Sequence, residues 1–219
     1  MSALHIDSIQ KSYNNIPLLT DIFIKCNTGE IIGILGRNGS GKTTLMQIIF
    51  GSIPTENRYI NVDGKMILNQ FDHINQIHYL PQFDFIPHHL RIRNIIKLYC
   101  NKLNTAKMFE NPIIKPLIDK KINQISGGER RLISVYLLLY SDAKFILLDE
   151  PFNGIAPIQR ENIQEIIQEQ SQFKGFIITD HDYRSILKIA TKTILLHDGG
   201  TKIIHSNEEL VEWGYLNEL

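Results

Sequence analysis

The sequence is poor in cysteine and has no excess of charge of either sign. Cys26 and Cys100 are the only two cysteines among 219 residues, and neither belongs to a cluster with metal-ligand spacing. We therefore expect two reduced, structural thiols rather than a disulfide framework or a zinc site. Lysine and arginine total 23, as do aspartate and glutamate, so the formal charge is zero and nothing in the charge balance predicts a nucleic-acid partner.

Long hydrophobic runs are also absent from the sequence. No apolar stretch approaches the roughly 20 residues that span a bilayer. Residues 1–7 do not show the basic-then-apolar pattern of a signal peptide, so we expect none. With 43% hydrophobic and 21% charged residues, the chain is predicted to form one globular unit with a substantial core.

Residues 36–43 read GRNGSGKT, a complete G-x-x-x-x-G-K-[ST] motif, which we call the phosphate loop. A strand-like run (30–35) precedes it and a helix-like segment (44–50) follows, which is the context that the motif requires. Glycines let backbone N–H groups converge on phosphates at a helix N-terminus. Lys42 supplies a mobile positive charge, and the Thr43 hydroxyl suits Mg²⁺. The motif predicts that ATP or another nucleoside triphosphate binds to Gly36, Arg37, Asn38, Gly39, Ser40, Gly41, Lys42, Thr43 and Thr44.

A second motif ends in two carboxylates. The run 145–148 is apolar throughout, which predicts a buried parallel strand, and Asp149 and Glu150 follow it directly. Asp149 can reach Mg²⁺, and Glu150 can polarise an attacking water, because phosphoryl transfer depends on positioning and charge stabilisation. Two solvated acids that close a strand are the alternative, and the phosphate loop upstream makes it the weaker one.

The third motif, ISGGER at residues 125–130, carries a family resemblance. A serine hydroxyl and glycine amides at the start of a helix form an anion site, although a helix cap without a ligand is the alternative. Together with the other two motifs, this segment resembles the Leu-Ser-Gly-Gly-Gln signature of ATP-binding cassette (ABC) ATPases. The resemblance runs from about residue 4 to about residue 205 and implies ATP and Mg²⁺ as ligands. It also implies that ATP held by a second cassette, in a homodimer or heterodimer, contacts the signature residues Ser126, Gly127, Gly128 and Glu129.

Three further residues match family landmarks in order. By the resemblance, Tyr13 stacks on adenine, Gln82 reaches Mg²⁺ and links the site to a helical insertion, and His181 contacts the γ-phosphate. An ordinary rim tyrosine and a polar loop histidine are the alternatives for the first and last of these. The predicted catalytic residues are Glu150, His181 and Gln82, and the predicted metal ligands are Thr43, Gln82 and Asp149.

The pattern of elements predicts an α/β fold of the P-loop NTPase kind. Short apolar segments with turn residues over 4–35 and 58–69 indicate β structure, with Asp63-Gly64 as a hairpin turn. Amphipathic spacing over 90–99 and 130–140 indicates helices. A polar, proline-containing connector near 111–116 is expected between these two helices. The remaining predicted elements are strands at 145–148 and 176–178, helices at 158–170 and 183–190, and a hairpin over 193–204.

We predict a single ABC ATPase domain over 1–219, built from two parts. Residues 1–82 and 141–219 form the nucleotide-binding core with its mixed, largely parallel sheet and antiparallel β part. Residues 83–140 form the helical insertion that carries the signature. Within this part, Phe83, Phe85 and Ile86 are interpreted as part of a groove for a transmembrane partner, with a packed loop as the alternative.

The sequence departs from the family pattern at a few positions. The signature has Glu129 and Ile125 where the family has Gln and Leu, and its serine and glycines are intact. Ala156 stands where family members typically have an Asp that helps to couple the two nucleotide sites. We expect weakened communication between the sites, or a partner subunit that completes it.

The resemblance implies an ATP-hydrolysing motor subunit on the cytoplasmic face of a membrane, coupled to an integral membrane transport subunit. A cassette ATPase outside transport, of the iron–sulfur assembly type, and a low-turnover regulatory cassette are the alternatives. Residues 151–154 and 179–181 resemble cassettes of lipopolysaccharide export and branched-chain amino-acid import. That similarity is short and assigns no substrate.

Overall fold

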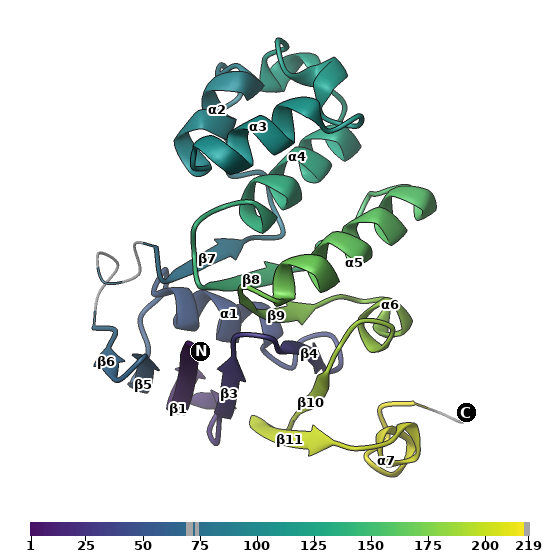
Figure 1. Ribbon diagram of the computed structural model, residues 1–219. Helices are drawn as coiled ribbons and strands as arrows, with labels where there is room; N and C mark the ends of the chain where they lie inside the picture. Colours follow the sequence, from purple (N-terminus) through teal and green to yellow (C-terminus); the bar gives the residue numbers. More distant parts are fainter. Residues whose placement is uncertain (69–71, 73–74, 217–219) are drawn as a thin grey trace.

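The computed structural model describes residues 1–68, 72 and 75–216, and within them two β-sheets surrounded by helices form the body of the molecule (Figure 1). Three helices, α2 (Ile92–Tyr99), α3 (Lys102–Glu110) and α4 (Gly127–Leu139), stand together at the top of Figure 1. None of the helices in the described part of the chain is long and apolar enough to span a membrane.

The larger sheet lies at the centre of the body. In order across the sheet, its strands are β11 (Gly200–Ile204), β10 (Lys192–His197), β4 (Ile31–Leu35), β9 (Gly175–Thr179), β8 (Phe145–Asp149) and β7 (Ile77–Leu80). All neighbours are parallel except the β10–β11 hairpin. Every residue of β4, β8 and β9 is buried, as expected for parallel strands covered on both faces. The predicted strands and the hairpin are thus confirmed.

The smaller sheet is antiparallel, as predicted. Its strands are β1 (Ala3–Tyr13), β2 (Ile16–Leu19), β3 (Phe23–Asn27), β5 (Asn57–Val62) and β6 (Lys65–Met66). Asp63 and Gly64 turn the chain between β5 and β6 with φ angles of 53° and 82°, as a two-residue hairpin requires. Cys26 of β3 is buried between the sheets, and Cys100 is buried after α2. Both are free thiols.

Helix α1 (Lys42–Phe50) begins directly at the phosphate loop. Gly41 precedes it with a φ of 102°, and Gly51 ends it with a φ of 83°. Only glycine adopts these backbone conformations readily, so the two glycines set both ends of the helix. Helix α1 packs between the two sheets through Leu45, Met46 and Ile48, which are fully buried. Its N-terminus is thereby fixed at the edge where the parallel strands end.

The segment between α2 and α4 contains more helix than the sequence indicated. The connector predicted near 111–116 follows α3, which the sequence did not indicate, and overlaps one 3₁₀ turn, Lys115–Leu117. A second 3₁₀ turn, Ile122–Gln124, lies between it and α4. Within α3, Met108 is the one fully buried hydrophobic residue, so the helix has no apolar stripe for the sequence to show. Its start is marked by Asn101, whose side chain accepts a bond from the N–H of Asn104 at 2.9 Å.

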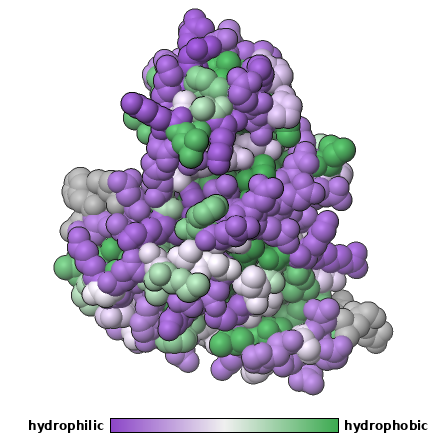
Figure 2. Space-filling view, viewed as in Figure 1, coloured by the Kyte–Doolittle hydropathy of each residue, from purple (hydrophilic) through white to green (hydrophobic). Residues whose placement is uncertain are grey.

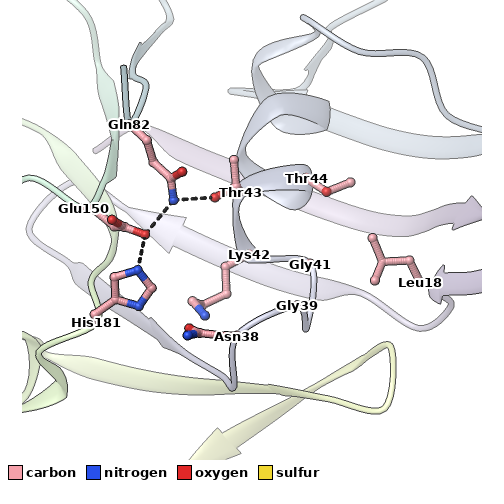
Figure 3. Close-up of a pocket in the computed structure, with 10 residues that line it drawn as sticks. All are labelled: Leu18, Asn38, Gly39, Gly41, Lys42, Thr43, Thr44, Gln82, Glu150 and His181. Atoms are coloured by element: carbon pink, nitrogen blue, oxygen red, sulfur yellow. Dashed lines mark hydrogen bonds and ion pairs between the residues drawn. The ribbon is translucent and has the colours of Figure 1, made fainter. Parts of the chain in front are cut away.

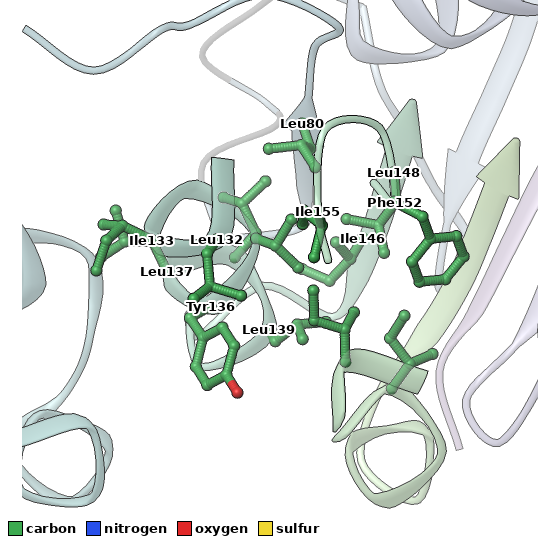
Figure 4. Close-up of a cluster of buried hydrophobic side chains, with 14 of the residues drawn as sticks. Leu80, Leu132, Ile133, Tyr136, Leu137, Leu139, Ile146, Leu148, Phe152 and Ile155 are labelled. Atoms are coloured by element: carbon green, nitrogen blue, oxygen red, sulfur yellow. The ribbon is translucent and has the colours of Figure 1, made fainter. Parts of the chain in front are cut away.

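Helix α4 is anchored to the central sheet by a continuous set of buried side chains. Leu132, Tyr136 and Leu139 of α4 belong to the same buried cluster as Leu80 of β7 and Ile146 of β8 (Figure 4). All five are no more than about 1% exposed. Because the core of a protein is close-packed, movement of α4 relative to these strands requires the cluster to repack. The helical part of the molecule is therefore joined to the sheet through the buried face of α4.

Three helices cover the remaining part of the core. Helix α5 (Pro157–Ser171) agrees with its prediction, and α6 (Tyr183–Leu187) is shorter than the predicted 183–190. Helix α7 (Asn207–Glu212) has no counterpart among the predicted elements. It is six residues long, too short for helical periodicity to stand out, and its one fully buried residue is Leu210.

Candidate functional site

The phosphate loop borders a cavity of about 390 Å³ that is lined by half of the predicted site residues (Figure 3). The loop and the start of α1 form one wall, and Gln82, Glu150 and His181 reach it from the ends of β7, β8 and β9. These strands are parallel neighbours, so their carboxyl ends meet at one edge of the sheet. The residues that line the cavity are Leu18, Asn38, Gly39, Gly41, Lys42, Thr43, Thr44, Gln82, Glu150 and His181.

Lys42 is folded back onto its own loop. Its Nζ atom donates to the carbonyl oxygens of Gly36 at 2.7 Å and of Arg37 at 3.2 Å. Burial lowers the pKa of Lys42, while the nearby carboxylates of Glu150 and Asp149 raise it. The amine therefore lies along the loop, held by neutral acceptors that a phosphate group can replace.

Asp149 is fully buried and holds two hydroxyl groups. Thr43 Oγ1 donates to its Oδ1 at 3.3 Å, and the Tyr79 hydroxyl donates to its Oδ2 at 3.0 Å. Burial raises the pKa of Asp149, and the two hydroxyl bonds act against this shift. Sequence reasoning missed Tyr79, which lies beside Asp149 because β7 and β8 pair in parallel with Tyr79 opposite Leu147.

The donor set at this point fits a magnesium ion. Mg²⁺ prefers oxygen ligands and usually takes one or two from the protein, the rest from water and substrate phosphates. The Thr43 hydroxyl and the Asp149 carboxylate offer such oxygens 3.3 Å from each other, and Gln82 bonds to the same hydroxyl. No cluster of three or more His, Cys, Asp or Glu side chains that could hold a metal occurs among the residues that the structure describes. A metal here would therefore depend on the phosphates of the nucleotide.

Glu150 is the centre of a hydrogen-bonded chain across the cavity. Gln82 Nε2 donates to Glu150 Oε1 at 2.5 Å and to Thr43 Oγ1 at 3.0 Å, and His181 Nε2 lies 2.7 Å from the same Oε1 (Figure 3). The Asn153 amide donates to Glu150 Oε2 at 3.4 Å. Glu150 has a φ of 53°, an unusual backbone conformation for a residue with a side chain, and it is 6% exposed. Its carboxylate is thus fixed in place at the edge of the phosphate loop.

Arg131 connects this site to α4, and sequence reasoning missed it as well. It is 8% exposed, and its guanidinium donates to the carbonyl oxygen of Pro81 at 2.5 Å, of Asp149 at 2.6 Å and of Glu150 at 2.7 Å. Burial lowers the pKa of Arg131, and surrounding carboxylates oppose this shift. The sequence carries no clear signal for it, because Arg131 directly follows Glu129 and Arg130 at the polar start of α4.

The signature residues lie apart from this cavity. Ser126 caps α4 by accepting a bond from the N–H of Glu129 at 3.2 Å, and the Glu129 carboxylate accepts from the N–H of Ser126 at 2.7 Å. This reciprocal pair is a capping box. The bonds from Ser126 lower the pKa of Glu129. Ser126 and Gly127 are exposed, and none of the four predicted signature residues lines the cavity.

Three other predicted residues lie at the margin of the site. Tyr13, at the end of β1, is 49% exposed and is not one of the side chains that line the cavity. Arg37 and Ser40 line a second cavity, of about 490 Å³, together with residues 195–199 and Tyr215. Tyr13 as an adenine platform, and Arg37 and Ser40 as phosphate contacts, remain predictions.

The chain matches known proteins over its whole length. The family model described as "ABC transporter" matches residues 19–153. The lipopolysaccharide export system ATP-binding protein LptB of Haemophilus influenzae is 31% identical, with 100% of this chain and 98% of that protein covered. LptB of Escherichia coli strain K12 has the same identity and coverage. The ergothioneine transport ATP-binding protein EgtV of Helicobacter pylori is 27% identical, with 86% of this chain and 94% of that protein covered.

Solved structures share the fold at lower sequence identity. An ATP-binding subunit of an ABC transporter has a TM-score of 0.83 and 18% identity, with 96% of this chain and 93% of that chain covered. A nucleotide-free ATP-binding cassette from an ABC transporter has a TM-score of 0.79 and 20% identity, with 99% and 96% covered. These likenesses confirm the predicted fold class.

Proposed function

The chain belongs to the ABC transporter family of ATP-hydrolysing proteins, and from this premise we propose that it drives transport through a separate membrane-spanning partner. The observation that carries the proposal is the chain of contacts Thr43–Gln82–Glu150–His181. It joins a magnesium-type hydroxyl, a carboxylate and an imidazole at the edge of one phosphate loop. This is the set of groups that positions and activates a water for attack on a γ-phosphate.

The roles within the site follow from position and chemistry. The loop amides and Lys42 bind the β- and γ-phosphates, and Thr43, Gln82 and Asp149 hold Mg²⁺, which neutralises charge on those phosphates when bound. The Glu150 carboxylate accepts the proton of the attacking water. His181 hydrogen-bonds to the γ-phosphate and, by its contact with Glu150, keeps the carboxylate aimed at the water. Tyr13 supports the adenine ring.

A second cassette completes the site. Ser126, Gly127 and Gly128 form an anion-binding helix start, yet they are remote from the phosphate cavity of their own chain. A head-to-tail pair, in a homodimer or heterodimer, brings this helix start against the γ-phosphate of the opposite chain. Hydrolysis separates the γ-phosphate from ADP, and release of this phosphate removes the charge that holds the pair together, so the pair opens.

The membrane partner docks on the helical part of the chain. The apolar side chains of Phe83, Leu98 and Leu103 are exposed by 80%, 77% and 67% there. The face shown in Figure 2 is mostly hydrophilic, with separate hydrophobic groups over this upper part. Phe85 is partly buried against Tyr99, with ring centroids 6.2 Å apart, so Phe83 is the better test of docking than Phe85. The LptB relatives are named for lipopolysaccharide export, which supports a place on the cytoplasmic face of a membrane.

The variant Glu150→Gln tests the proposal. Glutamine keeps the size of the side chain and one acceptor oxygen but cannot accept the water's proton, so ATP should bind, the dimer should form, and hydrolysis should fall by about a hundredfold or more. Steady-state ATPase assays and size-exclusion chromatography with MgATP measure these effects. Full hydrolysis in the variant would remove Glu150 as the base. Negligible hydrolysis by the wild-type chain would instead favour the regulatory cassette that Ala156 suggests.

A further inference from the structure

Helix α7 ends in a rigid cap built on glycine. Gly214 has a φ of 65°, and its N–H donates to the carbonyl oxygen of Val211 at 2.8 Å, while the N–H of Tyr215 donates to that of Leu210 at 2.8 Å. This pair of bonds is the Schellman arrangement, in which a left-handed glycine closes a helix. Leu210 is fully buried in the main hydrophobic cluster, so the arrangement is anchored in the core. We call residues 213–216 the C-terminal cap.

The C-terminal cap contacts the first residues of the phosphate loop. Arg37 Nη2 donates to the carbonyl oxygen of Gly214 at 2.5 Å. Tyr215 lines the second cavity together with Arg37 and Ser40, and its hydroxyl interacts with the backbone N–H of Gly36. The cap therefore lies against the loop at the second cavity and not at the phosphate cavity.

The two loop residues that the cap touches are the ones that hold Lys42. The Nζ atom of Lys42 donates to the carbonyl oxygens of Gly36 and Arg37. When this amine transfers to the phosphates of ATP, the peptide between these residues loses a charged donor and must readjust. Gly214 and Tyr215 contact this stretch of backbone through the Arg37 side chain and the Gly36 amide.

We propose that the C-terminal cap is a positioning element of the ATP site, with Tyr215 and the Gly214 carbonyl holding Gly36 and Arg37 in the conformation that binds phosphate. The inference rests on the proposed function, because it takes ATP as the ligand of the loop. Coupling between two sites is reciprocal, so ATP strengthens the packing of the cap on the loop to the same degree that the cap strengthens ATP binding.

The chain contains its own reporter for this coupling. Trp213 is the only tryptophan in the sequence, and it belongs to the cap. Its ring is 41% exposed, with its centroid 5.7 Å from that of His197 and with Lys202 Nζ 5.8 Å away. Tryptophan emission therefore reports on the cap alone, and a rearrangement that moves the indole relative to these two neighbours changes it.

The experiment compares nucleotide affinity with tryptophan emission in the full chain. A non-hydrolysable ATP analogue with Mg²⁺ is titrated into the wild type and followed by calorimetry and by fluorescence. We expect both to give the same Kd. Tyr215→Phe removes the hydroxyl and its interaction with the Gly36 amide, which should raise Kd about fivefold, and kcat at saturating ATP should change less than twofold. Tyr59→Phe, which removes a hydroxyl from strand β5 of the antiparallel sheet, is the matched control and should leave Kd unchanged.

Arg37 provides a second, independent variant. Arg37→Met should raise Kd and reduce the emission change, and Arg37→Lys should restore part of both because a lysine still donates to the Gly214 carbonyl. This variant decides the matter if circular dichroism shows that Tyr215→Phe is unfolded. Calorimetric binding by the wild type without an emission change, or with unchanged Kd in the folded variants, would overturn the inference and leave the proposed function intact. Absence of calorimetric binding by the wild type would overturn both.

Discussion

The phosphate loop and the signature differ in how far one chain completes them. At the loop, Lys42, Glu150 and His181 line one cavity, and Glu150 is held by two partners within 2.7 Å. At the signature, Ser126 and Gly127 are exposed, and the Ser126 hydroxyl bonds to Glu129 of its own helix. The first half is already arranged for chemistry, whereas the second is an anion site that caps a helix until a ligand arrives. Two equally clear sequence motifs can therefore differ in whether one chain alone completes the site that they form.

One side chain joins the two halves. Helix α4 begins at the signature, and its Arg131 donates to the carbonyl groups of Pro81, Asp149 and Glu150 at the loop side. Leu132 of the same helix belongs to the buried cluster that joins α4 to the sheet (Figure 4). A shift of the signature relative to the strands must therefore change the contacts of Arg131 with these carbonyl groups. The signature and the phosphate loop are thus separate surfaces that α4 connects.

The largest expected effect comes from a charge placed at the signature. Aspartate caps helices as well as serine does, so Ser126→Asp keeps the cap of α4 while its carboxylate repels the γ-phosphate of the opposite chain. We expect hydrolysis to fall about a hundredfold, the usual cost of losing a charge-stabilising donor, with ATP binding to the single chain changed less than twofold. ATPase assays, calorimetry and size-exclusion chromatography measure the three quantities.

Ser126→Asn is the matched control for this charge. It also caps the helix and adds no charge, so it should retain most of the activity. If Ser126→Asp hydrolyses ATP at the wild-type rate, the signature is only a helix cap and the difference between the two halves disappears.

The sequence was sufficient to predict the residues around the phosphate loop, because each of them belongs to a short motif or directly follows a strand. The phosphate loop, Asp149 and Glu150 each follow a strand, and parallel strands bring their carboxyl ends together whatever the rest of the chain does. His181 and Gln82 were placed by family resemblance, and both line the cavity. The β hairpins were predictable because turn residues such as Asp63-Gly64 are local signals.

The contacts that were missed depend on residues far apart in the chain. Tyr79 meets Asp149 across 70 positions and Arg131 meets Pro81 across 50, and nothing local in either segment names the partner. Arg37 meets Gly214 across 177 positions. Helices α3 and α7 were missed because each buries one fully enclosed hydrophobic residue, which leaves no periodic pattern to read.

The link between the halves gives the second largest effect. Arg131→Met leaves three carbonyl groups without their donor, so we expect the free energy of unfolding to fall by about 2 kcal/mol. Hydrolysis should fall about tenfold, because the backbone next to Gln82 and at Glu150 loses the hydrogen bonds that hold it in place. ATP affinity should stay within about twofold. Thermal unfolding, ATPase assays and calorimetry check these outcomes.

Arg130→Met is the matched control for the link. This neighbour pairs with Asp84 at 3.0 Å near the surface, and such a pair contributes less than about 1 kcal/mol. Equal losses of stability and hydrolysis in the two variants would show that a charge on α4 matters rather than the contacts of Arg131.

The smallest effect concerns Ala156, which does not line the phosphate cavity. It is the N-cap residue of α5, and its side chain makes no capping bond. Ala156→Asp supplies a carboxylate that accepts from the first turn, so α5 should be stabilised by about 1 kcal/mol. If the family's aspartate also couples the two ATP sites, turnover or its cooperativity with ATP should rise about twofold. Ala156→Asn separates the two effects, because it caps the helix without a charge. A higher melting temperature in both variants with no change in turnover would make the missing aspartate a helix cap alone, and communication between the sites would then run through Arg131.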